Sequence, residues 1–166
     1  AEYQDKIRIF MALRDGNTNL INDYKDSTSI DLSNCNSLKN VDVLANCTKL
    51  TKLDLSNCDS LENLRGLAKC TNLTSLNLSE CNSLQNIDGL ENCTNLTELD
   101  LGRCGIQNVD KLANCSNLTS LNLHWCWSLQ NLKGLSNCTN LTNLNLSYCK
   151  FLRNVDGVVN CIKLTE

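Results

Sequence analysis

Cysteine is the residue type with the most chemical potential in this sequence, since 12 of the 166 residues are cysteines. Thiols can pair as disulfides, hold a zinc ion or act as nucleophiles. A zinc site needs four converging ligands, which usually come from pairs only a few residues apart. Here successive cysteines are 11 or 12 residues apart along the chain. This spacing disfavours a zinc site, and it points instead to a repeating architecture.

The cysteines fall into two sets, and within each set neighbouring members are 22 or 23 residues apart. A fixed period in this range is the signature of a solenoid. Each set is therefore expected to form a file of small, buried, reduced thiols that contact loop backbone groups weakly. Some disulfides or a metal site remain the alternatives. The sets are Cys35, Cys58, Cys81, Cys104, Cys126 and Cys149, and Cys47, Cys70, Cys93, Cys115, Cys138 and Cys161.

Each period of the sequence contains two kinds of apolar pattern. Residues 73–78 read Leu-x-x-Leu-x-Leu, with the period of two that a half-buried strand requires. Residues 84–93 place an apolar residue every third position, which suits a 3₁₀ or extended return. Stacked parallel strands lie about 4.8 Å apart, so six coils make a body roughly 30 Å long. The prediction is an α/β solenoid with a parallel, concave sheet and short convex returns.

The segment Cys-Thr-Asn-Leu-Thr-x-Leu-Asn-Leu-Ser-x-Cys at residues 70–81 resembles the leucine-rich repeat family. It is most similar to the cysteine-containing class, which occurs in F-box partners of ubiquitin ligases. The short return Asn-x-x-Gly-Leu-x-Asn-Cys at residues 86–93 is similar to the compact repeats of internalin-type bacterial proteins. The resemblance covers about residues 27–166. It implies a leucine-rich-repeat solenoid, and it leaves the partner open because such repeats serve many functions.

The two ends of the chain differ from the repeats. Apolar residues at helical spacing predict a helix over residues 2–14 that ends near Gly16. Residues 1–26 would form an N-terminal cap over the first coil, and a helix that docks a partner is the alternative. Six repeats are expected at 27–163, and a seventh begins at 164–166. Either the polypeptide continues there, or the uncovered edge makes a homodimer.

Strand side chains that point away from the core define the expected binding face. One file, which precedes the first apolar strand residue, includes Glu98, Ser120 and Asn143. A second file is almost uniformly Asp or Asn and makes the face mildly acidic. The formal net charge is -3, which disfavours nucleic acid as a partner. No apolar run approaches the roughly 18 residues of a membrane span, so no membrane partner is expected.

Aromatic residues concentrate in repeats five and six, two residues beyond the strands. Trp125 and Tyr148 occupy equivalent positions, so their rings could lie side by side. Exposed tryptophan and tyrosine are common binding hot spots, although these rings could instead only cover turns. Repeat four is one residue short at Gly105, which either dents the rim or is a harmless length variant. The candidate partner-binding residues are Trp125, Trp127, Tyr148, His124, Arg103, Glu98, Ser120 and Asn143.

Catalysis is not expected. His124 is the sole histidine, and no acid is clearly placed to orient it in a nucleophilic triad. No phosphate-binding glycine loop or metal motif is present, so no cofactor or metal is expected. The predicted function is recognition of a protein or peptide through the concave face and the aromatic rim. The alternatives are a surface or secreted bacterial binder of protein or carbohydrate, and a structural or designed scaffold.

The expected compartment is the reducing cytoplasm, with an extracellular location as the alternative. Ten Asn-x-Ser/Thr matches occur in the repeats, and some fall within the expected strands. Glycans at those positions would cover the binding face. The matches could also follow simply from a repeat that is rich in Asn and Thr.

Overall fold

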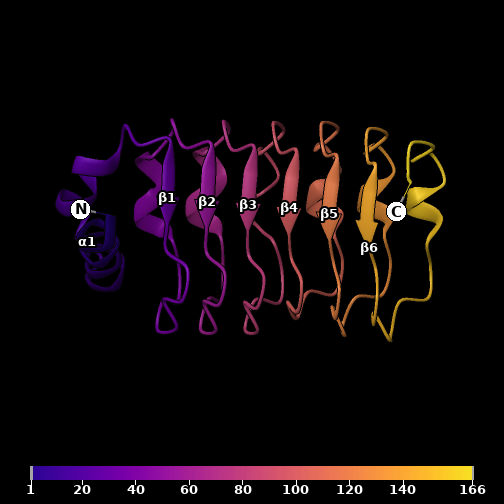
Figure 1. Ribbon diagram of the computed structural model, residues 1–166, viewed down its shortest axis with the longest axis horizontal. Helices are drawn as coiled ribbons and strands as arrows, with labels where there is room; N and C mark the ends of the chain where they lie inside the picture. The colour runs from indigo at the N-terminus through magenta and orange to yellow at the C-terminus, as the bar shows by residue number, and fades with distance from the viewer. Residues whose placement is uncertain (1, 166) are drawn as a thin grey trace.

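The structure is a computed structural model that describes residues 2–165. Six short strands form one parallel sheet in chain order, and they stand side by side along the long axis (Figure 1). Equivalent residues of neighbouring coils pair in register, as Leu53 does with Leu76. The predicted parallel solenoid is confirmed. The strands are β1 Ser29–Asp31, β2 Lys52–Asp54, β3 Ser75–Asn77, β4 Glu98–Asp100, β5 Ser120–Asn122 and β6 Asn143–Asn145.

Short 3₁₀ helices form the predicted returns on the side opposite the strands. Each begins after an asparagine whose side chain accepts the N–H two residues later, as Asn40 Oδ1 does from Asp42 at 3.1 Å. In coil three a turn replaces the 3₁₀ helix, and Gly89 has a φ of +112° there. The helices are η2 Asp42–Asn46, η3 Arg65–Lys69, η4 Asp110–Leu112, η5 Lys133–Leu135 and η6 Asp156–Val158.

The core consists of stacked leucines and the two files of cysteines. All twelve cysteines are free thiols, of which ten are buried while Cys35 and Cys149 are half-buried. The thiols point toward backbone carbonyls of the preceding coil: Cys81 Sγ lies 3.1 Å from the Leu55 oxygen. This confirms the expected thiol–backbone contact. Burial raises the pKa of Cys81 to about 12, so the thiols stay protonated at neutral pH.

The N-terminal segment closes one end of the core. Helix α1 spans Glu2–Asp15, and Gly16 follows with a φ of +62°, as expected for a left-handed helix C-terminus. Its buried face (Ile9, Ala12 and Leu13) packs toward the first coil, beside which the helix lies in Figure 1. The short helices α2 (Thr18–Ile21) and η1 (Asn22–Tyr24) lead into β1. Among the described residues, no helix has the length and apolar character needed to span a membrane.

The C-terminal end of the solenoid exposes apolar side chains of the last return. Val155, Val159 and Ile162 are 53%, 73% and 87% exposed. The backbone N–H of Thr165 donates to the Thr142 oxygen at 2.9 Å, which continues the ladder of contacts into the predicted seventh repeat. Residue 166, which that prediction includes, lies outside the described residues.

Candidate binding surface

Six residues at the ends of the strands share a left-handed backbone conformation. Their φ angles lie between 56° and 64°. In the first five of them the N–H donates to a carbonyl of the next coil, as Trp125 does to Ser147 at 2.8 Å. Asparagine tolerates this region, whereas bulky residues adopt it rarely and at an energetic cost. We call this file the strand-exit rim: Asn34, Asn57, Glu80, Arg103, Trp125 and Tyr148.

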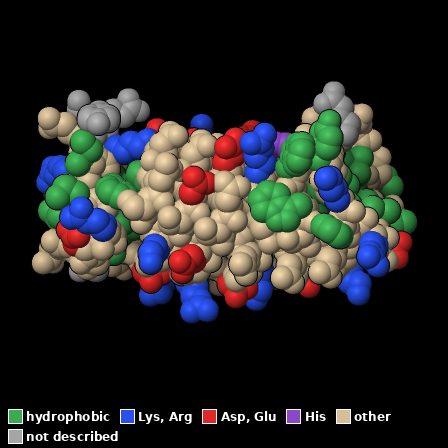
Figure 2. Space-filling model, turned by 90° about the horizontal axis from the view of Figure 1, so that it is seen from below, with side chains coloured by type: hydrophobic (Ala, Val, Ile, Leu, Met, Phe, Trp, Pro, Cys, Tyr) green, Lys and Arg blue, Asp and Glu red, His purple; other side chains and the backbone are tan. Residues whose placement is uncertain are grey.

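The rings of Trp125 and Tyr148 stack on the rim. Their centroids are 4.6 Å apart and their planes differ by 18°, which confirms the predicted side-by-side arrangement. Trp125 is 39% exposed and Tyr148 is 63% exposed. Trp127 and Phe151 are also exposed, and the four residues together are called the aromatic patch. Figure 2, seen from the side of the strand-exit turns, shows one group of hydrophobic side chains over the C-terminal half and another at the N-terminal helix.

Arg103 and His124 lie beside this patch. Arg103 Nη1 is 3.8 Å from Glu80 Oε1, and both side chains are about half exposed, so this rim ion pair is weak. The His124 ring covers Gly102, because a side chain at Gly102 would collide with the ring. Nδ1 of His124 is 3.2 Å from Oδ1 of Asn122. The group that orients this histidine is therefore an amide, and no carboxylate contact to its ring is seen among the described residues.

The remaining predicted residues lie on the strand face. Glu98, Ser120 and Asn143 pair in register on β4, β5 and β6. The adjacent Asp/Asn file has a structural role, since each of its side chains accepts the N–H two residues later; Asp54 Oδ1 accepts that of Ser56 at 2.8 Å. The eight predicted residues thus form two groups. Trp125, Trp127, Tyr148, His124 and Arg103 belong to the strand-exit turns, and the other three to the sheet.

A hollow of about 440 Å³ lies next to the aromatic patch, beside the place where coil four is one residue short. Gln107, Gln130 and Arg153 occupy the same position in coils four, five and six. Their backbones form a ladder, in which Gln130 N–H donates to the Gln107 oxygen at 2.9 Å. None of the lining residues is among the predicted partner-binding residues; the available signal was the missing residue before Ile106. The lining is Gln107, Ser128, Gln130, Phe151 and Arg153.

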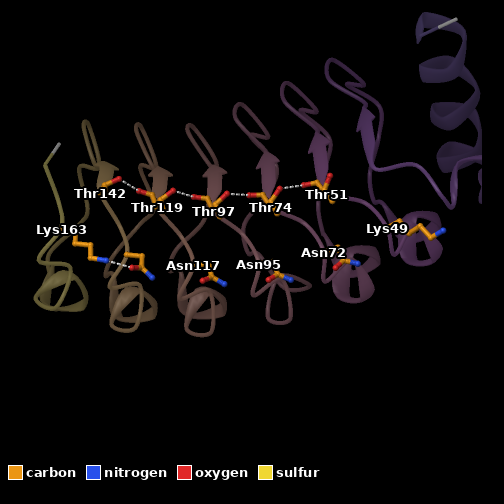
Figure 3. Close-up of a pocket in the computed structure, with 11 residues that line it drawn as sticks. Lys49, Thr51, Asn72, Thr74, Asn95, Thr97, Asn117, Thr119, Thr142 and Lys163 are labelled. Atoms are coloured by element: carbon orange, nitrogen blue, oxygen red, sulfur yellow. Dashed lines mark hydrogen bonds between the residues drawn. The ribbon is translucent and has the colours of Figure 1, made fainter.

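A longer groove of about 880 Å³ runs along the opposite side, where the strands begin (Figure 3). Its threonine hydroxyls donate to the preceding coil, as Thr74 does to the Thr51 oxygen at 3.1 Å. Its asparagine amides do the same, as Asn72 does to the Thr48 oxygen at 2.8 Å. These coil-to-coil hydrogen bonds explain the four Asn-Leu-Thr matches, which begin at Asn72, Asn95, Asn117 and Asn140. The donors of this groove therefore hold the fold together.

Comparison with known proteins places this geometry in a class. A model of Zer-1-like leucine-rich repeats matches residues 41–111, and a second leucine-rich repeat model matches residues 137–157. The chain is a leucine-rich repeat protein. No curated protein matches it.

Solved structures agree on the fold. An internalin (inlF) of Listeria monocytogenes is 24% identical with a TM-score of 0.73, covering 96% of this chain and 46% of that one. Internalin C2 of the same species is 28% identical with a TM-score of 0.71, covering 84% of this chain and 59% of that one. The plant peptide hormone receptor RGFR1, in complex with RGF2, is 18% identical with a TM-score of 0.55, covering 82% and 29%. This chain spans about half the length of the internalin structures.

Proposed function

We propose that this chain is a recognition module that binds a protein or peptide through the strand-exit rim and adjoining strand face of coils four to six. The observation that carries the proposal is the left-handed backbone of Trp125 and Tyr148. A bulky side chain in this region costs about 1–2 kcal/mol, whereas the asparagine used in the first two coils tolerates it. A strained backbone at residues whose aromatic rings are exposed is typical of a functional surface.

The chemistry of the patch supports a macromolecular partner. Stacked, exposed aromatic rings offer a large and rigid contact area that loses little conformational entropy on binding. The neighbouring Arg103, Glu98 and Ser120 provide donors and acceptors around the rings, as the polar margin of a protein interface does. Leucine-rich repeats act generally as binding scaffolds, and the RGFR1 structure contains a bound RGF2 on this fold.

The test begins with selection of binders from a random-peptide phage library on the parent protein. Trp125→Ala and Tyr148→Ala should each weaken the selected peptides by about tenfold or more, because each removes a hot-spot ring. Calorimetry measures the dissociation constants. Asn34→Ala and Asn57→Ala are the matched controls, since they change the same rim positions at the other end of the solenoid. Equal losses in both pairs, or no rim-dependent binder at all, would count against the proposal.

A further inference from the structure

Charge is distributed unevenly along the solenoid. Residues 1–115 contain 11 basic and 16 acidic side chains, whereas residues 116–166 contain four basic and two acidic side chains. Of the two acids of the second segment, Asp156 accepts a hydrogen bond from Asn154 on a return, and Glu166 lies outside the described residues. The aromatic patch therefore belongs to a C-terminal segment that is net basic, although the chain as a whole is net acidic.

The basic side chains of this segment also differ in their pairing. All seven ion-pair contacts of the described residues lie between positions 6 and 111. Lys133, Lys150 and Arg153 are exposed and have no acidic partner within the described part of the chain. Cations without a neutralising partner create a local positive potential that attracts anionic groups.

Two of these cations lie at the aromatic patch. Lys150 and Arg153 flank the exposed Phe151 in the sequence. The backbone N–H of Lys150 donates to the backbone carbonyl oxygen of Tyr148 at 3.0 Å. Arg153 and Phe151 line the hollow together with two glutamine amides and the Ser128 hydroxyl. The guanidinium of Arg153 can donate two parallel hydrogen bonds to a carboxylate, and the amides and hydroxyl can donate further ones. The ring of Phe151 beside them can contact an apolar side chain of the same ligand. Figure 2 shows basic side chains among the hydrophobic ones on this half.

We infer that the partner segment is an acidic peptide with interspersed aromatic or aliphatic residues. This inference rests on the proposed function and gives the partner its chemistry. The apolar side chains contact the aromatic patch, and the carboxylates contact Lys150 and Arg153. Glu80, Glu98 and Asp100 border the site on its N-terminal side and repel anionic groups. The most acidic part of the peptide therefore lies over coils five and six. The same acids disfavour a long polyanion such as RNA, which would cross them.

The repeat supplies a matched control for this inference. Lys39 stands in coil one at the position that Arg153 holds in coil six, and it is also exposed and forms no ion pair with any of residues 2–165. Lys69, on a return in coil two, is likewise exposed, and no ion pair to it is seen in the described part of the chain. The variant Lys39→Gln/Lys69→Gln therefore removes the same charge as Lys150→Gln/Arg153→Gln, but far from the patch. Glutamine already occupies the Arg153 position in coils four and five, so Arg153→Gln is expected to fold.

The test measures binding of three labelled probes to the full chain by fluorescence anisotropy: a glutamate–tyrosine copolymer, a lysine–tyrosine copolymer and polyuridylate. The glutamate–tyrosine copolymer should bind best and should weaken with added salt. Lys150→Gln/Arg153→Gln should weaken that binding by about tenfold, as loss of charge-assisted contacts does, and the control variant should leave it unchanged.

Several outcomes would overturn the inference. Stronger binding of the lysine–tyrosine copolymer would show that the partner is basic and not acidic. Stronger binding of polyuridylate would show that the partner is a nucleic acid. Equal weakening in the control variant, or none in either variant, removes the role of the two cations. If phage-selected peptides depend on Trp125 and Tyr148 but are not acid-rich, the acidic-partner inference fails while the proposed function stands. Selected peptides that ignore both rings overturn the proposed function itself.

Discussion

Mildly alkaline solution is expected to unfold this protein cooperatively, near pH 10. Burial raises the pKa of Cys58, Cys81 and Cys126 to about 12, from an ordinary thiol value of about 9. It raises the pKa of the other buried thiols in the same direction. Above pH 9 an unfolded chain releases these protons while the folded chain keeps them. Because the unfolded state then binds fewer protons, the free energy of unfolding falls as pH rises.

The effect is large because so many thiols act together. At a pH one unit above the ordinary thiol pKa, each thiol that the fold keeps protonated lowers the free energy of unfolding by about 1.4 kcal/mol. Burial raises the pKa of eight thiols to about 11 or higher. Together these eight would remove roughly 11 kcal/mol at pH 10, which is comparable to the whole stability of a typical domain. The contribution is fully present below about pH 8. Urea unfolding at a series of pH values measures the slope.

A variant checks the cause of this pH dependence. Cys81→Ala/Cys104→Ala removes two deeply buried thiols, so it should release about two fewer protons on unfolding at pH 10. Its stability at pH 7 falls by a separate amount, because small cavities form. A free energy of unfolding that stays flat up to pH 10.5 would show that the thiols are not buried as the structure has them.

The second large effect concerns a glycine in the return of coil five. A Cβ at Gly134 would fall well inside contact distance of the Val109 carbonyl oxygen and carbon in coil four. Both are backbone atoms and cannot rotate away. Gly134→Ala should therefore lower the free energy of unfolding by about 3 kcal/mol, since the coils must separate or the return must shift. Urea unfolding at neutral pH measures this difference.

The repeat contains its own evidence for this prediction. Gly66 and Gly157 hold the equivalent position and meet the same obstruction. In coil four Lys111 stands at this position in place of glycine. The preceding return, in coil three, is a turn and not a 3₁₀ helix. The matched control is Gly105→Ala, whose Cβ would meet its nearest atoms at an ordinary 3.4 Å. If the Gly134→Ala and Gly105→Ala variants are equally stable, the returns do not approach each other as closely as the structure has them.

Much of the fold could be predicted from the sequence, because the spacing of residues within the repeat determines it. The Leu-x-Leu period predicts the strands, and the 22- or 23-residue period predicts their register. The stacking of Trp125 on Tyr148 follows from the same period, since equivalent side chains of neighbouring coils stand one strand spacing apart. The helix before Gly16 follows from apolar spacing. In each case one local pattern, repeated along the chain, determines the contact.

The rest depends on where coils depart from the pattern. The left-handed backbone at Trp125 could not be inferred from tryptophan, which rarely adopts it; Asn34 and Asn57 were the available signal. The His124 ring over Gly102 requires knowledge of two neighbouring coils at once. The hollow beside Phe151 combines residues from three coils, so no single repeat contains it. The partner and the cytoplasmic location stay predictions, as do the domain boundaries and the homodimer.

The most direct test of the central claim uses intrinsic fluorescence. The only two tryptophans of the chain, Trp125 and Trp127, both belong to the aromatic patch and are 39% exposed. Binding of a selected peptide should remove water from these rings and shift their emission to shorter wavelength, with a midpoint equal to the calorimetric dissociation constant. Binding seen by calorimetry with unchanged tryptophan emission would contradict the claim that partners dock on this patch.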